Sequence, residues 1–409
     1  MERKKAQHVR ADANPIWKIY YDNTSNVNNA MNFLTRKHYY IYIVGNKIVN
    51  KNKTAKEDEM LTERIPKIVG AMVLAASACL ATSSLAQEYR MRVGLVTADS
   101  QAATKAARVM AFQIEAESQG RIDVEIYPAG QLGNFREMAE QVQLGTLEMT
   151  FTTGGGVAGI FPAIQAFDLQ YMLPNDRVAA IVKSDPELIS LLREETLKAT
   201  GSLRLMNVSN SGRWRSFFTR GRKVETASDL EGLKIRTISS PIQGKFVEAL
   251  GANPTPVPWP ELYTSFSTGV VDGTKNAISS ITSMRFDEFV KYGVIDNHSY
   301  IWEFWWANND WWNDLPPDLQ DVVLNGMVTL QQVADALPMH EDFVEYKAFQ
   351  ENGGELVFPT AEQRATFVAG AAPVREAYVS EYGNMFPDAI AAAIERAEAS
   401  IADSNEMAR

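Results

Sequence analysis

Arg236 is the residue of this chain whose surroundings best suit the binding of an anion. It ends a short predicted strand, Leu233–Arg236, and three hydroxyl-bearing residues follow it within four positions: Thr237, Ser239 and Ser240. A guanidinium group keeps its charge when buried and can hold a carboxylate through two parallel hydrogen bonds. Since ligands of open α/β sheets lie at the carboxyl ends of the strands, this position suits contact with an anionic ligand. The pattern alone favours the alternative, a solvated edge-strand face that Arg236 shares with Lys234.

Four other residues could complete such a site. Arg213 and Arg215 flank Trp214, which places two cations beside an aromatic ring, although charged surface residues give the same pattern. Trp259 lies in the sequence PVPWP, whose prolines stiffen its backbone, so the ring suits either a pocket wall or a core position. Asn276 lies just past a Val-Asp-Gly sequence, where it fits either a turn or a hydrogen bond to a ligand.

Two further motifs have more than one interpretation. A dense group of tryptophans suits a packed core between lobes, with direct stacking on a sugar-like or aromatic ligand as the alternative. Its members are Trp302, Trp305, Trp306, Trp311 and Trp312. Gly154–Gly156 could cradle an anion but lacks the Gly-Lys-Ser/Thr ending of a phosphate loop. We interpret these glycines as a flexible turn between lobes.

The sequence offers little for catalysis. Neither HExxH nor GxSxG occurs, and the chain after residue 86 has two histidines, His298 and His340. The single cysteine, Cys79, excludes a cysteine-based zinc site or redox pair. We therefore predict a protein that is not an enzyme and uses no cofactor. An exported enzyme acting on a small acid or sugar is the alternative.

Residues 60–86 have the order of a secretory signal peptide. Basic residues precede the apolar run Ile68–Ala81, and Ser84–Ala86 supplies small residues for cleavage. The run is shorter than the roughly 20 residues that a membrane span requires. We expect export to the periplasm and cleavage after Ala86, which removes Cys79. The alternatives are an uncleaved anchor and a lipid attached to Cys79.

Residues 1–59 are rich in Asn, Tyr and basic side chains and would hinder a signal peptide behind them, so we interpret them as a non-native or mis-annotated extension before a true start at Met60. The formal net charge is −10; residues 1–59 contribute +5 and residues 60–86 contribute +1, which leaves −16 for the rest. Such an acidic protein is a poor partner for nucleic acid or anionic membrane. An anionic ligand therefore needs a local cationic site.

Beyond residue 88, short strand patterns alternate with helical ones, which predicts βαβ units and a parallel sheet. The predicted strands are Arg90–Thr97, Ile122–Tyr127, Leu147–Thr152, Leu203–Val208, Trp214–Thr219 and Leu233–Arg236. The predicted helices are Gln101–Ser118, one capped by Asn134 that ends near Gly145, Asp176–Ala199, Ile242–Leu250, Pro260–Thr268, Pro317–Gly353 with a kink at Pro338, Thr360–Tyr382 and Ala389–Ser400. Two α/β lobes with a cleft between them follow from this pattern.

Four ordered motifs carry a resemblance to a known family. They are GRIDVEIYPAGQLG (Gly120–Gly133), SDLEGLKIRT (Ser228–Thr237), GANPTPVPWPELYTSF (Gly251–Phe266) and GVVDGTKN (Gly269–Asn276). With these motifs, residues 89–400 resemble the solute-binding proteins of tripartite ATP-independent periplasmic (TRAP) transporters, in the dicarboxylate-type DctP branch. The resemblance implies a two-lobed α/β fold of the periplasmic-binding-protein type, with a central ligand cleft and a long kinked helix that links the lobes. We expect lobe 1 to comprise residues 87–212 and 302–340, and lobe 2 residues 213–301 and 341–409.

The resemblance also implies a site and a function. The lobes would close over an organic acid and deliver it to small and large membrane subunits driven by an ion gradient, with no ATPase partner. Arg236 and Arg215 would hold the carboxylate, Trp259 would lie against the ligand, and Asn276 would reach into the cleft. Lobe 1 would contribute from Ala98–Ser100 and from Thr152–Thr153, with Thr153 as the candidate ligand contact.

One position departs from the family pattern. Where the family often reads Asp-Gly-x-Glu-Asn, this chain has Lys275 before Asn276. We expect Lys275 to add a cation to the cleft. Together with the tryptophans, it argues against a plain C4-dicarboxylate as the ligand.

Overall fold

A computed structural model describes residues 42–44, 47–49 and 87–407. The expected signal peptide at residues 60–86, Cys79 included, and most of the expected extension at residues 1–59 lie outside the described residues. Strands β1 (Tyr42–Val44) and β2 (Lys47–Val49) form an antiparallel pair. They belong to a unit separate from the one that begins at Ser83.

The larger unit is built on a mixed sheet of nine strands, counted over residues 87–407. The strands follow the order β4-β3-β5-β10-β6-β9-β7-β8, and β11 pairs with β10. Their bounds are β3 (Tyr89–Gly94), β4 (Ile122–Tyr127), β5 (Met149–Thr152), β6 (Leu203–Thr219), β7 (Lys234–Thr237), β8 (Asn253–Pro256), β9 (Gly273–Asn276), β10 (Tyr292–Asn308) and β11 (Glu355–Val357). The predicted parallel pairing is correct for β3 with β4 and β5, and for β7 with β8 and β9.

Two long antiparallel strands, β6 and β10, join the two halves of this sheet. The carboxyl half of β10 pairs with β5, whereas the carboxyl half of β6 pairs with β9. The sequence predicted two separate strands within β6; the structure has one, irregular in the middle, where Gly212 and Arg213 have φ values of 98° and 71°. Register shifts in the β6–β10 pairing fall between Val294 and Ser299 and between Tyr300 and Trp302. These irregularities mark the crossing between the halves.

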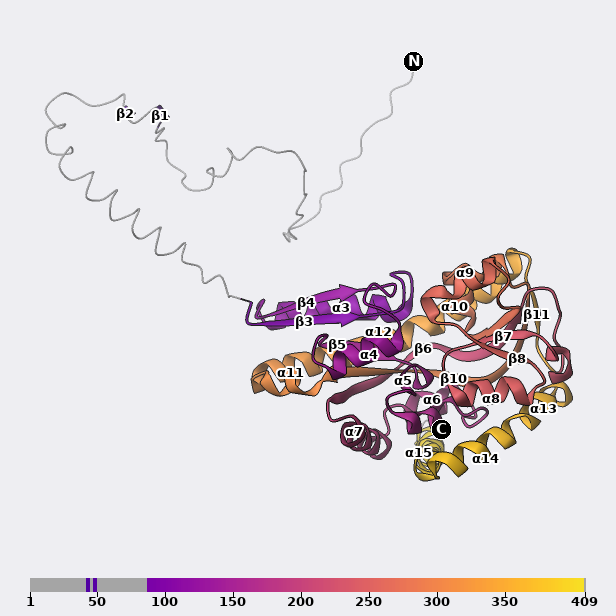
Figure 1. Ribbon diagram of the computed structural model, residues 1–409. Helices are drawn as coiled ribbons and strands as arrows, with labels where there is room; N and C mark the ends of the chain where they lie inside the picture. The colour runs from indigo at the N-terminus through magenta and orange to yellow at the C-terminus, as the bar shows by residue number, and fades with distance from the viewer. Residues whose placement is uncertain (1–41, 45–46, 50–86, 408–409) are drawn as a thin grey trace, which may run out of the picture. The chain divides into compact units, whose positions relative to one another are not determined.

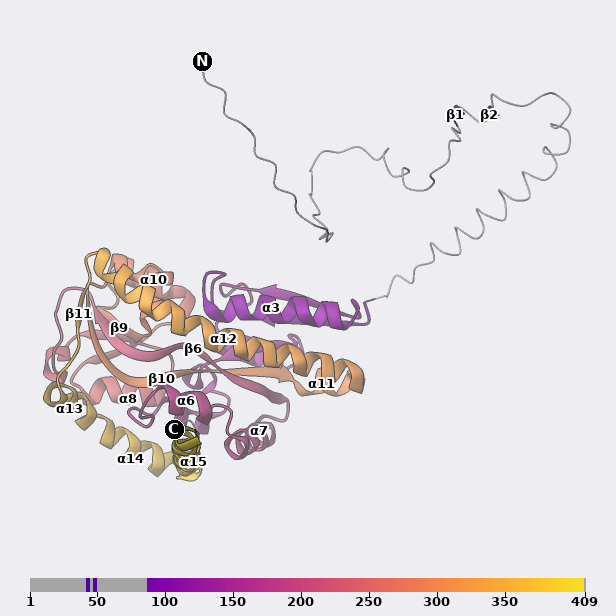
Figure 2. The ribbon, with the colours of Figure 1, turned by 180° about the vertical axis from the view of Figure 1, so that it is seen from behind.

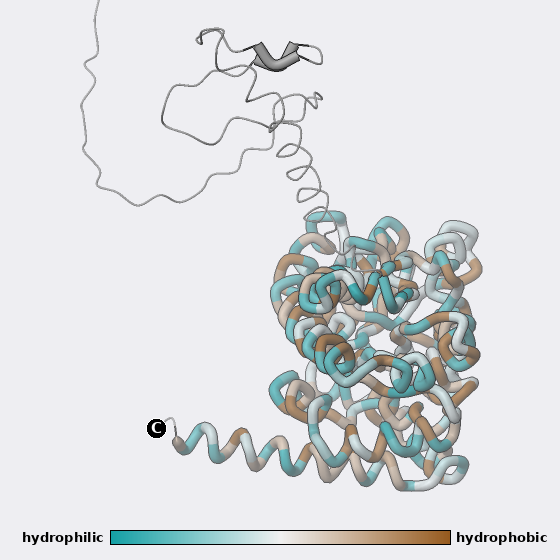
Figure 3. The backbone as a smooth tube through the Cα atoms, turned by 90° about the vertical axis from the view of Figure 1, so that its left-hand side faces the viewer, coloured by the Kyte–Doolittle hydropathy of each residue, from teal (hydrophilic) through white to brown (hydrophobic). Residues whose placement is uncertain are grey.

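The longest helix, α12 (Pro317–Glu351), runs along one side of the sheet. It packs against β6 and α3 (Ala102–Glu117), as Figure 2 shows, and it contains Pro338, where the sequence predicted the kink. Other helices lie along the opposite side of the sheet in Figure 1: α7 (Pro186–Thr200), α8 (Pro241–Ala249), α14 (Ala371–Tyr382) and α15 (Met385–Met407). The last turns of α15 extend beyond the rest of this unit in Figure 3. No helix among the described residues has both the length and the apolar character needed to cross a membrane.

The remaining helices are short, and all but α13 lie between strands in the chain. They are α4 (Phe135–Gln143), α5 (Gly154–Val157), α6 (Asp176–Val182), α9 (Leu262–Ser267), α10 (Ile278–Ser283), α11 (Asn309–Asp314) and α13 (Ala361–Ala369). Short 3₁₀ turns span Pro162–Asp168, Ala227–Leu230, Trp259–Glu261 and Phe286–Glu288. The predicted cap of α4 is confirmed, because the Asn134 side chain accepts from the backbone of Arg136 and Glu137.

Two long helices predicted from the sequence are interrupted. The segment expected as Asp176–Ala199 is split into α6 and α7, since Pro186 cannot continue a helix and Asp185 caps the next one. The segment expected as Thr360–Tyr382 is split into α13 and α14 at Gly370.

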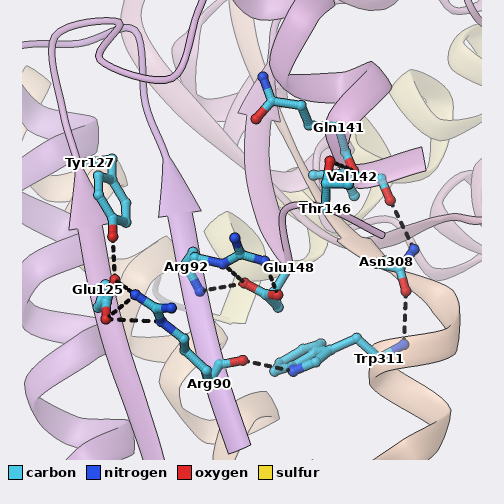
Figure 4. A network of polar contacts seen from close by, with 10 residues as sticks. All are labelled: Arg90, Arg92, Glu125, Tyr127, Gln141, Val142, Thr146, Glu148, Asn308 and Trp311. Atoms are coloured by element: carbon cyan, nitrogen blue, oxygen red, sulfur yellow. Dashed lines mark hydrogen bonds and ion pairs between the residues drawn. The ribbon is translucent and has the colours of Figure 1, made fainter. Parts of the chain in front are cut away.

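Polar side chains join β3, β4 and β5, the strands at one end of the sheet (Figure 4). Arg90 pairs with Glu125 across β3 and β4 at 2.6 Å, and Arg92 pairs with Glu148, just before β5, at 2.6 Å. The indole nitrogen of Trp311 donates to the carbonyl of Arg90 at 3.1 Å. These contacts add side-chain links to the parallel pairing of β3 with β4 and β5.

Candidate ligand-binding site

One cavity collects residues from both halves of the sheet. It encloses about 450 Å³ of atom-free space, including its open mouth. Its lining residues are Val96, Thr97, Gln101, Phe135, Phe151, Thr153, Ser211, Arg215, Arg236, Ile238, Trp259, Asn276, Ser280 and Ile301. Five of the six residues proposed from the sequence therefore meet at one place.

Arg236 lies in β7 with 5% of its surface exposed, whereas Lys234 on the same strand is exposed. The interpretation of both as one solvated face is therefore wrong for Arg236. Its Nε donates to the carbonyl of Val257 at 2.9 Å. Its guanidinium carbon lies 5.7 Å from the ring centroid of Trp259, within the range of a cation–π contact. These contacts fix the guanidinium against the cavity wall.

Arg215 reaches the same cavity from β6 and is also 5% exposed. Its Nε has no hydrogen-bond partner, and neither arginine forms an ion pair with a described residue. Burial lowers the pKa of Arg215, while Asp168 opposes this shift. Burial, followed by the charge of Arg215, lowers the pKa of Arg236. Two buried cations without a carboxylate partner form a site that an anion would stabilise.

Neutral donors complete the set. Thr153 Oγ1 and Trp259 Nε1 are buried and have no hydrogen-bond partner in the described part of the chain. The side-chain oxygen of Asn276 accepts from the backbone of Ala277 at 3.0 Å, which leaves its NH₂ group free to donate. The cavity therefore presents hydrogen-bond donors of several kinds to one volume.

Lys275 does not line this cavity, which corrects the expectation from the sequence. Adjacent residues of β9 point to opposite faces of the sheet, so Asn276 faces the cavity and Lys275 does not. Lys275 is 2% exposed and donates to Gln243 Oε1 on α8. Burial and the neighbouring charge of Arg215 lower the pKa of Lys275. Lys275 therefore lies behind the cavity wall and not in the cavity.

The tryptophan group fits the packed-core interpretation and not ligand stacking in this cavity, because none of its five members lines it. Trp305 and Trp306 are fully buried, and their indole nitrogens donate to Ser209 Oγ at 2.9 Å and Thr152 Oγ1 at 2.8 Å. The expected flexible turn at Gly154–Gly156 is wrong: these glycines begin α5 and are buried. A Cβ atom on Gly155 would lie 2.7 Å from the Cβ of Ser240, so this close approach requires glycine.

The sequence did not predict most of the cavity-lining residues that come from β3, β5 and the segments next to them. The resemblance pointed to Ala98–Ser100, but their neighbours Thr97 and Gln101 line the cavity instead. Ser211 and Ser280 had no signal in the sequence, since isolated serines are common in loops and helices. Only the tertiary fold brings them to this volume.

The fold and the cavity define a two-lobed binding protein with a buried cationic site in its cleft. Residues 93–381 match the family described as bacterial extracellular solute-binding protein, family 7 (DctP), and the chain belongs to this family. The C4-dicarboxylate-binding periplasmic protein DctP of Rhodobacter capsulatus is 28% identical over 337 residues, which cover 79% of this chain and 96% of that protein. The ectoine/5-hydroxyectoine-binding periplasmic protein UehA of Ruegeria pomeroyi is 27% identical over 316 residues, covering 76% and 91%.

Solved structures agree with this assignment. The sugar acid binding protein DctPAm from Advenella mimigardefordensis, in complex with galactonate, has a TM-score of 0.72 at 25% identity and covers 75% of this chain and 98% of its own. A TRAP periplasmic solute-binding protein from Desulfovibrio salexigens with bound orotic acid has a TM-score of 0.71 at 25% identity, covering 76% and 99%. The chain is therefore a TRAP-type solute-binding protein, which confirms the resemblance and sets aside the exported-enzyme alternative.

Proposed function

We propose that this protein binds its organic acid by bridging one carboxylate group between Arg215 and Arg236. The observation that carries the proposal is the pair of buried guanidinium groups that line one cavity without a carboxylate partner among the described residues. A bidentate carboxylate supplies the missing charge and accepts the free hydrogen bonds. Thr153 and Asn276 donate to the same ligand, and Trp259 forms an apolar wall beside it.

The ligand is held by closure of two lobes about the middle of the sheet. Lobe 1 comprises residues 87–212 and 302–340, and lobe 2 comprises residues 213–301 and the segment from residue 341 up to α15. The sequence assigned α15 to lobe 2 as well, but this helix packs on α6 and α7 of lobe 1, and its Arg396 pairs with Asp185 at 2.6 Å. Three observations support these boundaries: the positive φ values at Gly212 and Arg213, the register shift between Tyr300 and Trp302, and Pro338 inside α12. Because ligand contacts come from both lobes, the closed state binds the ligand more tightly and is selected by it.

Export and delivery complete the function. Residues 60–86 direct the chain to the periplasm, where the ligand-bound form delivers its acid to the small and large membrane subunits of a TRAP transporter. The names of the relatives, which are periplasmic binding proteins, support this location. The acid belongs to the range that relatives bind, from the C4-dicarboxylates of the Rhodobacter capsulatus protein to the galactonate held by DctPAm.

A thermal-shift screen of the purified protein against organic acids tests this function. A ligand that binds only the folded state raises the unfolding midpoint in proportion to the logarithm of its concentration over Kd. We expect one carboxylic acid to raise the midpoint, and its primary amide to leave it unchanged. A shift by the amide equal to that of the acid would contradict a carboxylate site. Conversion of the acid to a product during incubation would support the exported-enzyme alternative instead.

A further inference from the structure

A second cavity adjoins the ligand cavity and has a different chemistry. The two cavities share four lining residues: Thr97, Gln101, Ser211 and Ser280. Beyond these, the second cavity is lined by Ala102 and Ala103 at the start of α3, by Gly212, Ser279 and Ser283, and by Glu341 on α12. We call this second cavity the annex. A ligand anchored at Arg236 can extend into it past the four shared residues.

The annex presents neutral hydrogen-bonding groups. Ser279 and Ser280 are largely buried, and Ser283 Oγ is buried without a hydrogen-bond partner in the described part of the chain. Gln101 uses its side-chain oxygen to accept from the backbone of Ala98 at 3.0 Å, which leaves its NH₂ group to donate. Hydroxyl groups both donate and accept, so they match the hydroxyl groups of a ligand.

The charge of the annex disfavours a second carboxylate. Glu341 is the only ionisable residue that lines it, and its carboxylate is paired with Lys105 Nζ at 2.8 Å. Lys105 is not among the lining residues. A carboxylate that entered the annex would lose its water and meet an acid instead of a free cation.

Gly212 keeps this volume open. A Cβ atom at this position would lie 2.8 Å from Ser279 Oγ and 2.9 Å from the Cβ of Ala277, and the φ value of 98° also favours glycine. Gly212 precedes Arg213 and lies at the crossing between the two halves of the sheet. The annex therefore lies next to the region that must move when the lobes close.

We propose that the annex is a specificity subsite for the distal part of the ligand, and that this part carries hydroxyl groups. The ligand is then a polyhydroxylated monocarboxylic acid of the aldonic type, with its carboxylate at Arg215 and Arg236 and its hydroxylated chain in the annex. This proposal rests on the proposed carboxylate site and adds the chemical class of the rest of the molecule.

Isothermal titration with two acids of different length tests the annex. On this proposal, D-galactonate, with six carbons, extends from the arginines into the annex, whereas D-glycerate, with three, occupies the arginine end. In the wild-type protein we expect galactonate to bind more tightly than glycerate. The double variant Ser279→Ala/Ser283→Ala removes two hydroxyl partners and should weaken galactonate binding about tenfold or more, since each neutral hydrogen bond contributes about fivefold. Its affinity for glycerate should be unchanged.

Two further variants make the outcome decisive. Ser283→Leu fills the annex and should also weaken galactonate selectively, whereas Ser267→Ala, an exposed serine on α9, serves as the matched control. Unchanged galactonate affinity in both annex variants would overturn the proposal, as would an equal loss for both acids. Adipate bound by the wild type as tightly as galactonate would overturn the hydroxylated class. If the wild type bound no acid at all, the carboxylate site itself would be contradicted.

Discussion

Arg236 is held between Val257 and Trp259: its Nε donates to the Val257 carbonyl at 2.9 Å, and its guanidinium carbon lies 5.7 Å from the Trp259 ring centroid. Neither contact occupies an N–H donor of the two terminal nitrogens. These nitrogens make no hydrogen bond to a described residue and are free for a carboxylate. The side chain is therefore oriented before the ligand arrives, which lowers the entropic cost of binding.

Substitution of Arg236 by lysine should weaken acid binding even though the charge is kept. An ammonium group cannot form the two parallel hydrogen bonds of a guanidinium group, and it has no Nε to donate to Val257. We expect a loss of about tenfold or more in affinity, measured by isothermal titration. Wild-type affinity in Arg236→Lys would show that the site requires only a positive charge.

Substitution of Arg215 by methionine should stabilise the ligand-free protein and abolish the response to ligand. The guanidinium of Arg215 is desolvated and close enough to Arg236 to lower the pKa of Arg236. Its removal relieves this burial of charge, which outweighs the lost attraction to Asp168 because burial is the larger effect on Arg215. We expect the free energy of unfolding without ligand to rise by about 1 kcal/mol or more. Urea unfolding with and without the acid measures both effects. A destabilised variant that still responded to the acid would contradict this role.

The position of Lys275 shows what a sequence motif leaves out. Lys275 and Asn276 are neighbours in the chain, and the motif alone suggests one site for both. The sequence did not predict β9 as a strand, so nothing indicated that Lys275 and Asn276 point to opposite faces of a sheet. Its four residues are all buried, so the strand lacks the polar–apolar period by which sequence patterns identify strands.

The same reason explains the missing prediction of β10. This strand of 17 residues is buried on both faces almost throughout, and its tryptophans follow no simple period. By contrast, Arg236, Trp259 and Asn276 were identified because they lie in motifs with distinctive turn residues, and Arg215 was identified through the family resemblance. The hydroxyl groups from Ser211 and Ser280 come together only through the tertiary fold, which a single sequence does not encode in local patterns.

Arg213 joins the middle of β6 to two helices, and its removal should cost more stability than the removal of one partner. Its Nη1 donates to Asp342 Oδ2 at 2.9 Å on α12, and its Nε donates to Asp176 Oδ1 at 3.0 Å on α6. Arg213→Gln leaves two carboxylates unpaired, with a loss of about 1–2 kcal/mol, whereas Asp342→Asn leaves the Asp176 pair intact. Urea unfolding of both variants shows which one loses more free energy of unfolding. A larger loss in Asp342→Asn would contradict a junction centred on Arg213.

Glu303 should make stability depend on pH. It is fully buried in β10, accepts from Ser209 Oγ at 2.9 Å, and has one carboxylate oxygen without a partner. Burial raises its pKa to about 7. The folded state therefore keeps a proton that the unfolded chain releases near its usual pKa of 4.5. Protonation of Glu303 therefore stabilises the folded state fully below pH 4.5. This contribution decreases as pH rises from 4.5 to about 7 and is lost above that pH.

The variant Glu303→Gln stays neutral and should lose this pH dependence. Relative to the wild type, its free energy of unfolding should rise between pH 5 and pH 8 by roughly 1–3 kcal/mol. Urea unfolding of both proteins at the two pH values gives the difference and cancels the titration of other groups. An identical difference at both pH values would show that Glu303 does not titrate in this range.

The most direct test of the carboxylate site is isothermal titration of Arg236→Ala with an organic acid that binds the wild type. The matched control is Lys234→Ala, which removes an exposed cation from the same strand. We expect Arg236→Ala to lose about 2–5 kcal/mol of binding free energy, because the ligand carboxylate is left buried without its partner. Lys234→Ala should bind like the wild type. A folded Arg236→Ala protein with wild-type affinity would contradict the assignment of Arg236 as the anchor of the ligand.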